Sequence, residues 1–116
     1  MNNGDKNMRM WMVSPKHMCR KHLLGEHLET HMFVGCILKG IKLEGYINKG
    51  LLEVDSLRNR HNALVKEMNR RGYNHKSPLK DFRNKNTTRV SINRNLSFKE
   101  LMNRCKECRD RYEKNN

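Results

Sequence analysis

The chain has 116 residues and a formal net charge of +13, with 25 Lys and Arg against 12 Asp and Glu. This length builds one small domain, and a hydrophobic content of 35% leaves that domain only a small core. No apolar run reaches the roughly 18 residues of a membrane span, and residues 1–7 lack the apolar segment of a signal peptide, so we expect a cytoplasmic protein without membrane contact.

The first predicted elements are a disordered extension at residues 1–7 and a helix that ends near Val34. Residues 1–7 are polar and show no periodicity, and the single predicted domain occupies residues 8–116. Ser14 can cap the helix, with Pro15 in its first turn. Its apolar positions repeat every four residues: Leu24, Leu28 and Met32.

Two further helices are predicted after a glycine-punctuated connection with one helical turn. The second helix starts at Asp55–Ser56 and ends before Gly72. After a basic connection with a short extended piece at Arg89–Ile92, the capping-box pattern Ser97–Glu100 starts a third helix that runs through Tyr112. The sequence therefore predicts an all-α fold, a single compact domain of three helices joined by long loops.

The strong positive charge favours a polyanionic partner, and nucleic acid is the first candidate. Aromatic residues make up 6% and are scattered, which disfavours a basic helix lying on an anionic membrane. A solvated basic surface without a ligand is the alternative. The basic residues that we expect to contact DNA are Lys21, Arg58, Arg60, Arg70 and Arg71. We expect the protein to be a monomer.

Four cysteines raise the question of a metal site. Cys105 and Cys108 form one half of a zinc-ribbon pattern, and Cys19 with His22 supplies two further ligand types at a spacing of three. A tetrahedral zinc site is therefore one interpretation, and free helical thiols in a reducing compartment are the other. A redox pair is disfavoured because no βαβ pattern surrounds it.

Histidines and carboxylates also recur in the first predicted helix. His22, Glu26 and Glu29 share one stripe, which suits acid–base chemistry beside an anionic substrate or, alternatively, a solvated face. His17, His27 and His31 are interpreted as ordinary surface or core-edge histidines on different faces.

The order of these motifs resembles the phage endonuclease V family of pyrimidine dimer DNA glycosylases. Arg9 is followed, at the family's interval, by the segment Cys19–Glu29 with its His-Leu-x-Gly-Glu-x-x-Glu pattern. A second block is similar as well, with Leu57–Arg60 and the basic-Gly-Tyr-Asn ending of Lys66–Asn74. The similarity covers about residues 9–78, and the family is all-α with three helices.

The resemblance implies a DNA glycosylase and abasic-site lyase, without a cofactor, acting on double-stranded DNA that is ultraviolet-damaged or abasic. In that family a terminal α-amine attacks C1′ of the sugar and forms a Schiff base. By position, Glu29 matches the catalytic carboxylate, His22 an active-site histidine and Arg9 a phosphate or sugar contact. A phage or viral protein acting in the host cell, or associated with the virion, fits this picture.

The residue that carries the reactive amine in the family corresponds to Met8, which is internal in this sequence. We expect a chain that starts at Met8 to place its α-amine in register with Glu29. The family's arginines immediately before and three residues after the catalytic Glu are replaced by Leu28 and Met32. The alternative function is therefore a non-catalytic basic DNA-binding or virion-associated protein that retains the fold.

Overall fold

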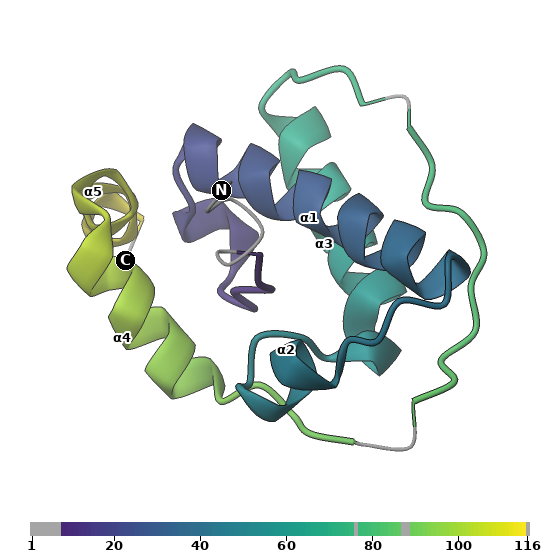
Figure 1. Cartoon of the computed structure of the whole chain (residues 1–116). Helices are drawn as coiled ribbons and strands as arrows, with labels where there is room; N and C mark the ends of the chain where they lie inside the picture. Colours follow the sequence, from purple (N-terminus) through teal and green to yellow (C-terminus); the bar gives the residue numbers. More distant parts are fainter. Residues whose placement is uncertain (1–7, 76, 87–88, 116) are drawn as a thin grey trace, which may run out of the picture.

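The computed structural model describes residues 8–75, 77–86 and 89–115 (Figure 1). The predicted extension at residues 1–7 lies outside them. The elements in chain order are η2 (Pro15–His17), α1 (Arg20–Leu38), α2 (Glu44–Asn48), η3 (Val54–Ser56), α3 (Leu57–Arg70), α4 (Arg94–Arg104) and α5 (Lys106–Lys114). Since the described residues contain no strand, the all-α prediction is confirmed, but the count of three helices is wrong. Among these helices none is both long and apolar enough to cross a bilayer.

The cap of the first long helix lies five residues later than predicted, at Cys19 instead of Ser14. Cys19 is the N-cap of α1, because its backbone is extended and its thiol accepts a hydrogen bond from the backbone N–H of His22. Ser14 precedes only the short 3-10 turn η2, and its side chain makes no capping bond. The helix continues through Gly35 and ends at Leu38, beyond the predicted Val34.

The middle of the chain follows the prediction closely. The five-residue helix α2 confirms the single helical turn expected between the glycines. Helix α3 buries Leu57 and Leu64 completely, and Gly72 follows its last turn with φ 88°, a left-handed conformation that glycine adopts at low cost. The predicted extended piece at Arg89–Ile92 forms no strand.

The predicted third helix is two helices, α4 and α5, separated at Cys105. Cys105 has extended backbone angles and caps α5 with its own thiol, which accepts a hydrogen bond from the N–H of Cys108. Helix α4 begins earlier than predicted, because the side chain of Asn93 accepts the bond from Leu96. Ser97 is not a cap: its buried hydroxyl donates to the carbonyl of Trp11 instead.

The N-terminal segment 8–13 is buried between the helices, and this burial positions the candidate site. Met10 belongs to a cluster of core residues with Phe33, whereas Trp11 belongs to a second cluster with Leu23. The N–H of Met10 also donates to the carbonyl of Leu51, at 2.8 Å. The segment is thereby held between α1 and α4, which lie on either side of it in Figure 1.

Candidate functional site

A cleft of about 690 Å³ opens where the N-terminal segment meets α1 and α4. Met8, Arg9 and Glu29 are among the residues that line it. The wall of the cleft carries both acidic and basic side chains. Its exposed cations are Lys21, Lys49 and Arg104.

The Glu29 carboxylate accepts a hydrogen bond from the backbone N–H of Arg9, with 2.8 Å between Arg9 N and Glu29 Oε1. Because the nitrogen of Met8 is three covalent bonds from that of Arg9, it also lies close to this carboxylate. Burial raises the pKa of Glu29 to about 7, against the opposing Arg9 hydrogen bond and with the support of the nearby Glu26 charge. At neutral pH this carboxyl group is therefore present in both forms, as proton transfer requires.

Arg9 is fixed in the wall of the cleft. Its guanidinium donates to Ser97 Oγ at 3.1 Å and to Glu100 Oε2 at 3.3 Å, and it stacks on Trp11 with 3.8 Å to the ring centroid. Only 7% of the residue is exposed. An arginine held on several sides presents its charge in one geometry.

The basic residues predicted to contact DNA divide into exposed and buried side chains. Lys21 is exposed at the cleft. Arg70 is exposed while paired with Glu67, and the partly exposed Arg58 pairs with Asp81. These three remain on the surface of the protein.

Arg60 and Arg71 are not on the surface. Arg60 forms a bidentate ion pair with Glu26, with 2.6 Å from Nε to Oε2 and 2.9 Å from Nη2 to Oε1. Its side chain is 7% exposed and that of Glu26 is fully buried. Arg71 pairs with Glu67 and donates to the carbonyls of Pro15 and Met18. Both side chains hold helices together.

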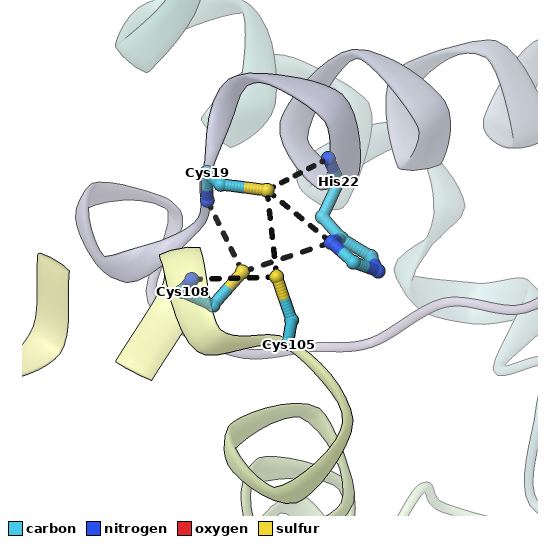
Figure 2. A group of neighbouring side chains, drawn as sticks. All are labelled: Cys19, His22, Cys105 and Cys108. Atoms are coloured by element: carbon cyan, nitrogen blue, oxygen red, sulfur yellow. Dashed lines mark hydrogen bonds between the residues drawn. The ribbon is translucent and has the colours of Figure 1, made fainter. Parts of the chain in front are cut away.

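The four zinc candidates lie together, although they come from distant parts of the chain (Figure 2). The Cys19 sulfur is 3.8 Å from that of Cys105 and 3.3 Å from Nδ1 of His22, and the Cys108 sulfur is 3.7 Å from the same nitrogen. All four ligand atoms fall within 4.8 Å of one another. The two pairs occupy the first turns of α1 and α5, so each N-cap cysteine faces the other helix.

His22 connects this cysteine cluster with the cleft. Its Nδ1 points toward the sulfurs, and Figure 2 shows its other ring nitrogen pointing away from them. The ring also lines the cleft and packs edge-on against Trp11, at 5.8 Å between centroids. Burial, followed by the charge of Lys21, lowers the pKa of His22 below its ordinary value.

A second cluster contains only histidines: His27, His31, His61 and His75. The expectation that His27 and His31 lie on different faces is wrong, because residues four apart share one side of a helix. His17 lies elsewhere, edge-on to Tyr112. Burial and then the neighbouring imidazoles lower the pKa of His27 to about 4, so its ring is neutral at pH 7.

Comparison with known proteins identifies one family. The family model for pyrimidine dimer DNA glycosylases matches residues 8–81, which is more than half of the chain. This match includes Met8, Arg9 and Glu29 and ends before α4 and α5. A search of curated proteins and a search of solved structures found no match.

Proposed function

Because the chain belongs to the pyrimidine dimer DNA glycosylase family, we propose that it removes damaged pyrimidines from duplex DNA and cleaves the backbone at the resulting abasic site. One observation carries the proposal: the Glu29 carboxylate is hydrogen-bonded at the Met8–Arg9 peptide, inside a charged cleft. A half-buried carboxyl group with a raised pKa, placed beside the Met8–Arg9 peptide in an open cleft, suits sugar chemistry better than structural support.

The proposed nucleophile is the nitrogen of Met8 in a chain that begins there, where it is a free amine. The amine attacks C1′ of the deoxyribose, the bond from C1′ to the base breaks, and the base leaves with the electron pair and takes up a proton. The nitrogen then loses a proton, the bond from C1′ to the ring oxygen breaks, and that oxygen keeps the electron pair and takes up a proton. The nitrogen lone pair thereby forms an iminium at C1′. Glu29 faces this cation and, with a pKa of about 7, exchanges the protons.

The proposed DNA contacts are the exposed cations at the cleft, Lys21, Lys49 and Arg104, with Arg9 behind them. A base must leave the helical stack before its sugar reaches Glu29, at a cost of a few kcal/mol. Contacts to phosphates offset this cost. Because such contacts do not depend on the base sequence, binding should tolerate any flanking sequence.

We also propose that zinc occupies the cysteine cluster and clamps α5 to the start of α1. Zinc with three sulfurs and one imidazole requires about 3.8 Å between sulfurs and about 3.6 Å from sulfur to nitrogen. The observed separations of 3.8, 3.3 and 3.7 Å approach these values. Backbone N–H groups of Cys19 and Cys108 also donate to sulfurs of the cluster. Burial outweighs this effect at Cys108 and raises its pKa, so a bound cation would be needed to hold that sulfur as a thiolate.

With zinc on Nδ1, His22 is not a proton acceptor. Its remaining N–H is then available as a hydrogen-bond donor to a DNA group in the cleft. This assignment leaves acid–base chemistry to Glu29 and gives His22 a positioning role.

The test is nicking of ultraviolet-irradiated plasmid by the wild-type chain, by Glu29→Gln and by Glu100→Gln. Glu100 lines the same cleft, and its variant removes the same charge while the glutamine amide oxygen can still accept the hydrogen bond from Arg9. We expect Glu29→Gln to lose nicking while keeping or improving DNA affinity, and Glu100→Gln to keep nicking. Binding without nicking by the wild-type chain, begun at either residue 1 or Met8, would instead favour the non-catalytic DNA-binding protein.

A further inference from the structure

We propose that the four-histidine cluster is a second metal site, which binds a divalent transition-metal ion of the zinc class between α1 and α3. His27 and His31 occupy successive turns of α1, His61 lies on α3, and His75 follows the left-handed turn at Gly72. Their ring centroids are 4.6–5.4 Å apart for the five closest pairs. No feature of the glycosylase chemistry requires four converging imidazoles.

All four rings lack a hydrogen bond at one nitrogen, and that nitrogen is one that a metal ion could bind. The Nε2 atom of every one of them is buried and has no hydrogen-bond partner. A buried polar atom without a partner costs about 1–3 kcal/mol, so four in one place are a heavy cost unless a ligand accepts their lone pairs.

In two of the four rings, the nitrogen opposite Nε2 has a hydrogen-bond partner that selects the required tautomer. Nδ1 of His61 lies 3.0 Å from Asn62 Oδ1, and since that oxygen only accepts, the proton is on Nδ1. His31 hydrogen-bonds the backbone of Ser77, which leaves its Nε2 free as well. Such outer partners orient metal-binding histidines and raise their basicity.

The distances suit a four-coordinate ion after small movements of the rings. The four ligand atoms lie within 4.8 Å of one another, whereas a tetrahedral zinc site with four imidazoles needs about 3.4 Å between nitrogens. Rotation of the rings about their terminal side-chain bonds supplies the difference. His75 is also tethered by its backbone N–H, which donates to Asn69 Oδ1 at 3.3 Å. The bound ion would join α1, α3 and the following segment.

Zinc alone is the probe, and its content is measured by mass spectrometry in the folded full-length chain. The design separates the two clusters by using Cys105→Ser, which removes one cysteine ligand. We expect two zinc ions per chain in the wild type and one in Cys105→Ser. Adding His75→Gln should remove that last ion, whereas the matched addition of His17→Gln, a histidine outside both clusters, should not.

Nitrogen NMR of the wild-type imidazoles gives a readout that does not depend on the variants folding. On addition of zinc to the metal-free chain, all four Nε2 resonances should move together to the positions of coordinated nitrogens and saturate at a second equivalent. If the wild type saturates at one equivalent and these resonances stay in place, the rings only pack against one another and the proposal is wrong.

Discussion

Replacement of Arg60 by Met should destabilise the fold strongly while leaving DNA affinity almost unchanged. The Arg60 side chain is 7% exposed and that of its partner Glu26 is completely buried, with two hydrogen bonds of 2.6 and 2.9 Å between them. Methionine can fill the space of the arginine stem, so the principal effect is an unpaired carboxylate inside the protein.

The magnitude follows from the burial of both groups. Removing one partner of a buried ion pair costs about 3–5 kcal/mol, because the remaining charge keeps its full desolvation penalty. For a chain of this size, that loss lowers the melting temperature by roughly 10–20 °C. The matched control on the same helix is Arg58→Met, whose partner Asp81 is fully exposed, and it should cost less than about 1 kcal/mol.

Urea unfolding followed by circular dichroism measures both variants, and DNA affinity is measured on the same samples below the melting temperature. The double variant Arg60→Met/Glu26→Gln should recover part of the stability, since it neutralises the stranded carboxylate. The reasoning fails if Arg60→Met is as stable as Arg58→Met, or if it weakens DNA binding while keeping its stability.

Three further predictions concern stability, metal and DNA. Hydrogen bonds from Arg94 hold the pKa of Glu53 at about 2, so this carboxylate stabilises the fold above pH 4.5 and loses that effect as the pH falls toward 2. Glu53→Gln should therefore cost about 1–2 kcal/mol at pH 7 but almost nothing at pH 2, and equal losses in melts at both pH values would contradict this. A chelator should lower the melting temperature of Cys36→Ser by as much as that of the wild type. Cys105→Ser should have a lower melting temperature without chelator, and the chelator should lower it by less. An equal effect of the chelator on both variants would count against the zinc clamp. If the protein contacts roughly 4–8 phosphates, the plot of log affinity against log salt should have a slope of about −4 to −7, and a slope near zero would exclude DNA binding through phosphates.

The residue types and spacings of the sequence were sufficient to group Cys19, His22, Cys105 and Cys108. They share a ligand chemistry that is recognisable without coordinates, and the structure places them together. The all-α class followed from the helical periodicity of apolar residues in the same way. By contrast, the break at Cys105 had no sequence signal, because a cysteine that caps a helix with its thiol is not among the usual capping residues.

Residues whose role depends on a distant partner could not be predicted. In the sequence, Arg60 cannot be distinguished from the exposed arginines of its helix. Only the structure shows that it pairs with Glu26, which lies 34 positions earlier. The same limit hid the histidine cluster, since His61 and His75 join the two histidines of α1 only through the packing of α3. The i,i+4 spacing of His27 and His31 was the one local signal available.

The central claim, a Schiff base formed by the Met8 amine beside Glu29, is tested most directly by borohydride trapping. The chain beginning at Met8 and the 116-residue chain are each incubated with a duplex that contains one abasic site, and the reduced adduct is located by peptide mass. We predict an adduct on the nitrogen of Met8, formed at least about tenfold faster by the chain that begins there, since only that chain holds the amine in place. Equal trapping of both chains, or an adduct on an internal lysine such as Lys21, would contradict the account.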